Sequence, residues 1–171
     1  NPAADSHLPA GYGPDNLAGK AACKAALCEE LRLTHDPHTP ILAVISRLTH
    51  QKGIDLVAGA VDRLRDRPFQ LVVLGTGEPS IETDLRQLAS RDPGRIRFID
   101  RFDEGLAHRI EAGADIFLMP SRFEPCGLNQ MYSMRYGTPP VVHATGGLAD
   151  SVTHTSAETL ASGREIGRAH V

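Results

Sequence analysis

The chain has 171 residues, of which 41% are hydrophobic and 23% are charged, a composition typical of one globular domain with a sizeable core. A net charge of −3 gives no basic footprint for nucleic acid, and the longest apolar runs have strand length, which argues against a membrane span. The three cysteines form no Cys-x-x-Cys pair, so the sequence indicates a reducing compartment, and we expect a cytoplasmic protein.

Short apolar runs alternate with segments of helical spacing along most of the chain. A first helix is predicted over Leu17–Leu33. The predicted strands are Ile41–Ile45, Phe69–Leu74, Ile96–Ile99, Asp115–Met119 and Pro140–His143. The predicted helices between them are Ile54–Asp66, Pro79–Ser90, Glu104–Ala112 and Leu128–Tyr136. This strict alternation predicts an α/β fold, a Rossmann-like doubly wound parallel sheet with helices on both faces.

The stretch Pro120–Val152 contains the most informative loops. Glu124 lies between a predicted strand and a predicted helix, and the N–H groups that open such a helix suit an anion such as phosphate. A second small-residue turn, with Gly146 and Gly147, follows the next strand. Because the carboxyl ends of parallel strands meet at one edge of a sheet, both turns are expected to face the same crevice.

Arg47 and Lys52 lie in the loop after the first predicted strand, just before Gly53. Two cations at the end of a parallel strand suit a diphosphate. From the spacing alone, an ordinary solvated loop with two surface charges is the favoured interpretation.

Four segments resemble a known family: SRLTHQKG, SRFEPCGLNQ, RYGTPPVV and TGGLADSV. They are similar to the C-terminal domain of bacterial glycogen synthases and plant starch synthases, which are retaining glucosyltransferases of the two-domain GT-B architecture. The resemblance runs from Asn1 to about Val152. It implies an enzyme that transfers glucose from ADP-glucose to the non-reducing end of an α-1,4-glucan, with the acceptor held largely by an N-terminal Rossmann domain that is missing here.

The resemblance also implies roles for individual residues. The catalytic set is Arg47, Lys52 and Glu124, with the two cations on the donor phosphates and the carboxylate on the glucose hydroxyls. The donor-binding set is Phe102, Cys126, Gly127, Leu128, Asn129, Gly146 and Gly147. Within it, Phe102 is expected to stack on adenine.

No cofactor and no metal are expected, because the two cations neutralise the leaving diphosphate. His35 and His38 are the only close histidine pair and lack further ligands. Cys126 at a helix start has the setting of a reactive thiol, but it is expected to line the pocket. Met131 and Met134 are expected in the core.

Three alternatives remain open at this stage. One is another GT-B glycosyltransferase with a different sugar nucleotide, and a second is a non-catalytic nucleotide-binding module. The third is an NAD enzyme, suggested by the glycines of Leu74–Pro79 but disfavoured because the third glycine of a dinucleotide fingerprint is absent.

The domain prediction is a nucleotide-sugar-binding domain over residues 1–152, incomplete at both ends, and a divergent tail over residues 153–171. Residues 165–171, EIGRAHV, match a translated sequencing adapter and are predicted to be non-native. The chain by itself is expected to catalyse no glucosyl transfer.

Overall fold

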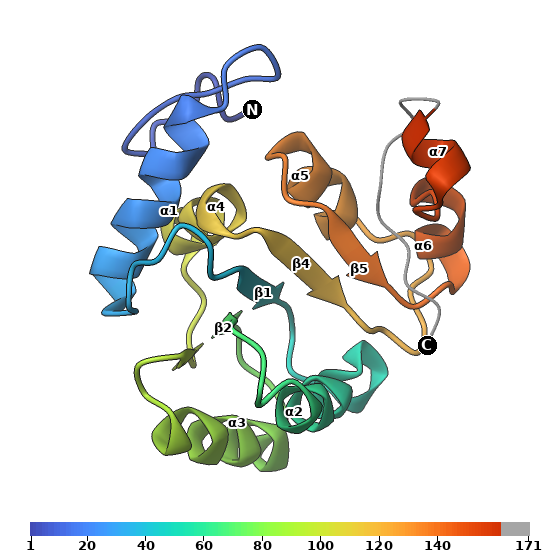
Figure 1. Cartoon of the computed structure of the whole chain (residues 1–171). Coiled ribbons are helices and arrows are strands. Elements are labelled where there is room, and N and C mark those ends of the chain that lie inside the picture. The colour runs from blue at the N-terminus through green and yellow to red at the C-terminus, as the bar shows by residue number, and fades with distance from the viewer. Residues whose placement is uncertain (162–171) are drawn as a thin grey trace.

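The computed structural model describes residues 1–161, and its centre is a parallel sheet of five strands (Figure 1). The strands are β1 (Ile41–Ile45), β2 (Gln70–Leu74), β3 (Ile96–Ile99), β4 (Ile116–Met119) and β5 (Pro140–Val142). Their order is β3-β2-β1-β4-β5, and every neighbouring pair is parallel. The chain therefore starts at the centre, builds one side and returns to build the other, as predicted for a doubly wound sheet. The order reverses between β1 and β4, which is where such sheets bind ligands.

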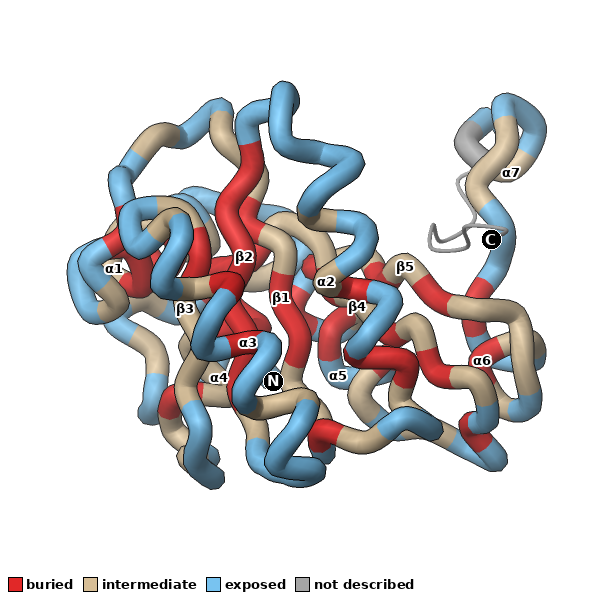
Figure 2. Tube along the Cα trace, turned by 90° about the horizontal axis from the view of Figure 1, so that it is seen from below, coloured by how far each residue is buried: buried red, intermediate tan, exposed pale blue. Residues whose placement is uncertain are grey.

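Alternate residues of the central strands face two separate cores. In β2, Val72 and Leu74 belong to one apolar cluster, and Leu71 and Val73 belong to the other. The first cluster packs against α1 (Ala18–Leu31) and α4 (Glu104–Gly113), and the second against α2 (Ile54–Arg63) and α3 (Pro79–Arg91). Figure 2 shows the buried residues concentrated along the strands between these helices. Strands buried on both faces read as continuous apolar runs, which is why they could be located from the sequence.

The helix ends follow local chemistry. Pro79 opens α3 at a position where its missing N–H costs nothing. The side chain of Asp103 accepts a hydrogen bond of 2.9 Å from the Leu106 N–H and caps α4. Helix α2 ends at Arg63, three residues before the predicted end, and the Arg95 guanidinium binds the carbonyls of the chain that follows. The remaining helical segments are η1 (His50–Lys52), α5 (Asn129–Arg135), α6 (Gly146–Ser151) and α7 (Ala157–Ala161).

The first residues of the chain pack against the far end of α4 and α5. The hydroxyl of buried Tyr12 donates to the Tyr136 carbonyl at 2.8 Å. The ammonium of Lys20 donates to the Thr138 hydroxyl at 2.7 Å and to the Ala112 carbonyl at 2.9 Å. The Tyr12 contact fixes the N-terminal segment to the end of α5, and the Lys20 contacts fix the start of α1 to α4 and to the chain that follows α5.

Within residues 1–161, no helix has both the length and the apolar character needed to cross a membrane. The predicted non-native segment 165–171 lies outside the described residues. The boundaries 1–152 and 153–171 stay predictions.

Candidate functional site

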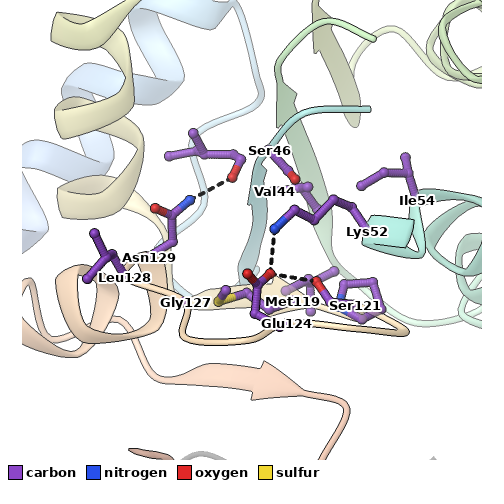
Figure 3. A pocket seen from close by; sticks show the side chains of 13 residues that line it. Val44, Ser46, Lys52, Ile54, Met119, Ser121, Glu124, Gly127, Leu128 and Asn129 are labelled. Atoms are coloured by element: carbon purple, nitrogen blue, oxygen red, sulfur yellow. Dashed lines mark hydrogen bonds and ion pairs between the residues drawn. The ribbon is translucent and has the colours of Figure 1, made fainter. Parts of the chain in front are cut away.

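The candidate site is a pocket at the carboxyl ends of β1 and β4, where the strand order reverses (Figure 3). Its walls come from the end of β1, from η1 and from the loop between β4 and α5. The lining residues that matter below are Ser46, Lys52, Ser121, Glu124, Gly127 and Asn129. The fold thus brings the two predicted loops together although 72 residues separate Lys52 from Glu124.

Lys52 and Glu124 form the central contact of the pocket. The Lys52 ammonium lies 2.5 Å from Oε2 of Glu124, and the Ser121 hydroxyl donates to the same oxygen at 3.1 Å. The two side chains are only 18% and 9% exposed, so the pair is weakly screened by solvent. The other oxygen, Oε1, has no hydrogen bond within the described residues. The pair therefore orients a carboxylate with one oxygen free to accept from a ligand hydroxyl.

A second set of contacts holds the η1 segment against the β4–α5 loop. The Arg122 guanidinium makes two hydrogen bonds of 2.7 Å to the Asp55 carboxylate, a bidentate pair. It also donates at 2.7 Å to the His50 carbonyl, and the Arg122 N–H donates to the Gln51 carbonyl at 2.9 Å. We call this set the Arg122–Asp55 clamp. It sets the position from which Lys52 reaches Glu124.

Glycine is required beside the clamp. Gly53 has a φ of +68°, and a Cβ there would lie 2.1 Å from the Pro120 carbonyl oxygen. A side chain at this position would push the η1 segment away from the loop that carries Glu124.

The start of α5 supplies the predicted backbone donors. The N–H groups of Gly127, Leu128 and Asn129 donate no hydrogen bond within residues 1–161. The Asn129 side chain donates to the Ile45 carbonyl at 2.9 Å, which anchors the start of α5 to the end of β1. Free N–H groups at this position can bind an anion next to the Lys52–Glu124 pair.

The glycine pair on the second turn packs against the backbone of the loop that carries Glu124. Gly146 has a φ of +46°, and a Cβ there would lie 2.2 Å from the Glu124 carbonyl oxygen. The Gly147 N–H donates to that same carbonyl at 3.0 Å. Neither glycine is among the residues that line the pocket. The turn supports the backbone of Glu124 from behind.

Arg47 and Phe102 lie in a neighbouring hollow that shares Ile45, Ser46 and Asn129 with the pocket. Arg47 is exposed, and its side chain makes no hydrogen bond or ion pair with the described residues. The Phe102 ring is 88% exposed. An exposed cation and a bare aromatic face next to a pocket with free N–H donors can accommodate a nucleotide.

Helix α5 buries different side chains from those that the sequence predicts. Met131 was expected in the core, but it is 44% exposed, because α5 buries its polar face instead. Gln130 and Ser133 are fully buried there, and Gln130 donates to the Ser151 hydroxyl at 2.9 Å. Cys126 is exposed and lies outside the pocket lining, whereas Leu128 lines the pocket and is 54% exposed.

Comparison with known proteins assigns the chain to a family. Residues 39–168 match the model of the family described as "Glycosyl transferases group 1". The chain belongs to this family. The NAD alternative is thereby removed, and Gly77 of the incomplete fingerprint packs against backbone, since a Cβ there would lie 2.1 Å from the Leu48 carbonyl oxygen.

Curated relatives of this chain confirm the resemblance that the sequence shows. A glycogen synthase of Nitrosospira multiformis is 55% identical over 98% of this chain and 34% of its own length. A glycogen synthase of an Anaeromyxobacter species is 60% identical over 89% of this chain and 32% of its own length. The chain thus spans about a third of the length of these relatives.

A solved structure agrees with this assignment. The catalytic domain of starch synthase IV from Arabidopsis thaliana, bound to ADP and acarbose, matches all of this chain and 36% of its own, with a TM-score of 0.92 and 36% identity. A sucrose-phosphate synthase from Thermosynechococcus elongatus matches 75% of this chain and 33% of its own, with a TM-score of 0.61 and 25% identity. The GT-B type of Rossmann-like fold predicted from the sequence is therefore confirmed.

Sequence reasoning missed the parts of the candidate site that hold the predicted residues in place. Ser121 and the Arg122–Asp55 clamp were not singled out. Asp55 was visible only as an acidic residue in the first turn of a helix, and 67 residues separate it from Arg122.

Proposed function

We propose that this chain is the donor-binding domain of a glycogen synthase that transfers glucose from ADP-glucose to an α-1,4-glucan with retention. The observation that carries the proposal is the Lys52–Glu124 pair, which leaves one carboxylate oxygen free beside the unpaired N–H groups that open α5. The similarity to glycogen synthases and to a starch synthase bound to ADP supports the choice of substrate.

The proposal gives each side chain a chemical task. Glu124 accepts hydrogen bonds from glucose hydroxyls through Oε1, and the N–H groups of Gly127, Leu128 and Asn129 bind the diphosphate. Arg47 and Lys52 stabilise the charge that develops on the leaving diphosphate, so the proposed step assigns that task to no metal or cofactor. Phe102 stacks on the adenine ring.

The partners in the proposal are ADP-glucose, a glucan acceptor and a second Rossmann-like domain of the same polypeptide, in line with relatives about three times as long as this chain. The proposed location is the cytoplasm, because all three cysteines are free thiols, as in a reducing compartment.

Calorimetric titration of the chain with ADP and UDP tests the donor assignment. We expect saturable ADP binding, weaker UDP binding, and several-fold weaker ADP binding in Arg47→Ala. Arg91→Ala is the matched control, because Arg91 is also exposed but lies at the end of α3, away from the pocket. Preference for UDP would favour a transferase of another sugar nucleotide. If Arg47→Ala leaves the affinity for ADP unchanged, Arg47 does not contribute to the binding site.

Transfer itself is tested in a chimera in which this chain replaces the matching third of the Nitrosospira glycogen synthase. We expect the chimera to extend glycogen from ADP-glucose. A folded chimera that binds ADP but transfers no glucose would restrict the function to that of a nucleotide-binding module.

A further inference from the structure

Where the N-terminal segment contacts α4, three residues of types that bind metals lie close together. This cluster is outside the pocket described above, which we call the donor pocket. Asp5, His7 and His108 each offer one ligand atom, and these atoms all lie within 4.8 Å of one another. None of the three lines the donor pocket or its neighbouring hollow. The cluster was invisible in the sequence because Asp5 and His108 are 103 residues apart.

Asp5 is held in place as an anion. Its side chain is 5% exposed, and Oδ2 lies 2.7 Å from Nδ1 of His108. Oδ1 accepts from the His7 N–H at 2.9 Å, and the Tyr136 hydroxyl donates to Oδ2. Burial alone would raise the pKa of Asp5, but these hydrogen bonds together lower it to about 2.

The imidazoles of His7 and His108 offer the other two metal-ligand atoms. The His7 and His108 rings meet edge to face, with centroids 4.9 Å apart and an interplanar angle of 69°. His108 is part-buried, and His7 is exposed with no hydrogen bond from its ring within residues 1–161. One anchored carboxylate, one partly buried imidazole and one imidazole open to solvent therefore converge on one spot.

We propose that Asp5, His7 and His108 bind a divalent transition-metal ion, with Zn²⁺ the best match. Two imidazoles and one carboxylate are ligands that Zn²⁺ prefers, and three protein ligands leave a further position for water. The ion would bind a carboxylate oxygen of Asp5 and Nδ1 of His108 in place of the hydrogen bond that joins them, with the ring proton of His108 on Nε2. Tyr136 stays hydrogen-bonded to Asp5 and orients that ligand.

The ion would connect two elements that the sequence separates widely. Asp5 and His7 belong to the N-terminal segment, and His108 belongs to α4. Since the site requires both elements in their folded positions, the ion binds the folded state and stabilises the domain.

Zinc titration of the tag-free chain, treated with EDTA and then freed of it, tests the site by calorimetry. We expect one Zn²⁺ per chain and a rise in melting temperature on adding ZnCl₂. His7→Ala should weaken binding at least about tenfold, since even loss of a group that only supports a ligand typically costs that much. Because the His7 ring is exposed, we expect this variant to keep the wild-type fold, and circular dichroism checks this.

His38→Ala is the matched control, because His38 is an exposed histidine in the loop before β1. It should bind Zn²⁺ as the wild type does. Co²⁺ provides a second measurement, since visible absorption from bound Co²⁺ should appear in the wild type and in His38→Ala but fade in His7→Ala. Absence of saturable Zn²⁺ binding, or equal binding by wild type and His7→Ala, would show a plain Asp–His hydrogen-bond network and overturn the proposal.

Discussion

Glu124 illustrates how a single residue can be prepared for a ligand by its neighbours. Lys52 and Ser121 both bind Oε2, and the carboxylate is 9% exposed. In the proposed function its second oxygen accepts from a sugar hydroxyl, and the Gly147 N–H donates to its main-chain carbonyl. The residue is therefore fixed at both its backbone and its side chain before any substrate arrives.

Glu124→Ala in the chimera should lower turnover by about 100-fold or more, while ADP affinity changes only a few-fold. The reason is that Glu124 acts on the glucosyl group and not on the leaving nucleotide. Steady-state kinetics and ADP titration of the same preparation measure the two quantities. Equal losses in both would show that Glu124 only maintains the local structure.

Lys52→Gln should lower turnover by about 100- to 1,000-fold, with a much smaller change in KM for ADP-glucose. Breaking the glucose–phosphate bond adds negative charge to the diphosphate, and a fixed cation binds that transition state more strongly than the ground state. Arg47→Lys should also be costly, because an ammonium cannot reproduce the forked donors of a guanidinium. A loss confined to KM would make either residue a docking contact.

At the scale of elements, the site depends on how η1 and α2 are joined to the β4–α5 loop. The Arg122–Asp55 clamp connects them through side chains that are 35% and 45% exposed. Ion pairs so exposed contribute little to stability, because solvent screens them. The clamp therefore matters more for position than for the free energy of unfolding.

Asp55→Asn should lower turnover of the chimera about tenfold while changing the melting temperature by only a few degrees. Asn cannot accept both guanidinium hydrogen bonds, so the η1 segment and Lys52 shift relative to Glu124. Asp62→Asn is the matched control, since Asp62 lies on the same helix and pairs with Arg65 at the surface, 3.4 Å away. The positioning role fails if the two variants have the same turnover.

The elements also show why part of the structure could be predicted and part could not. Ile41–Ile45 was located to the residue, because a buried parallel strand needs a continuous apolar run. The edge strand Ile96–Ile99 was also located to the residue, from its Ile and Phe side chains, although Arg97 interrupts them. The apolar spacing of α5 misled for Met131, since this seven-residue helix buries Gln130, whose amide NH2 group donates to the Ser151 hydroxyl. Helical spacing identifies a face but not which face is buried when a polar side chain finds a partner inside.

The candidate site, too, could be predicted only in part from the sequence. Loops at strand ends could be predicted as ligand-binding, because a parallel sheet brings them to one edge. The contacts that orient Lys52 and Glu124 could not be predicted. Arg122 and Asp55 are 67 residues apart, and only the folded sheet brings them together.

At the scale of the whole molecule, the N-terminal segment closes the end of the domain formed by α4 and α5. Tyr12, Cys23, Ala112 and Tyr136 form a small apolar cluster there. Glu111 is buried beside it, and its main-chain carbonyl accepts from the Thr138 hydroxyl. A buried carboxyl in this position makes the stability of the domain depend on pH.

Burial raises the pKa of Glu111 to about 7, from an ordinary value of 4.5, while nearby His108 opposes the rise. Between these two values the folded protein keeps a proton on Glu111 that the unfolded chain releases. The free energy of unfolding therefore falls as pH rises from about 4.5 to about 7. Above about pH 7 the ionisation of Glu111 changes it no further, and the total fall is on the order of 2–3 kcal/mol. Glu111→Gln removes the titration, so we expect wild type and variant to differ little near pH 5 and the variant to be more stable at pH 8. Urea unfolding followed by circular dichroism, with EDTA present throughout, measures this difference.

Other groups titrate outside this pH window. Asp5 titrates below it, and Lys20, whose pKa burial lowers to about 8, titrates above it. Both proteins share every histidine, so the difference between their profiles reports Glu111 alone, and parallel profiles from pH 5 to 8 would show that Glu111 is ionised in the folded domain.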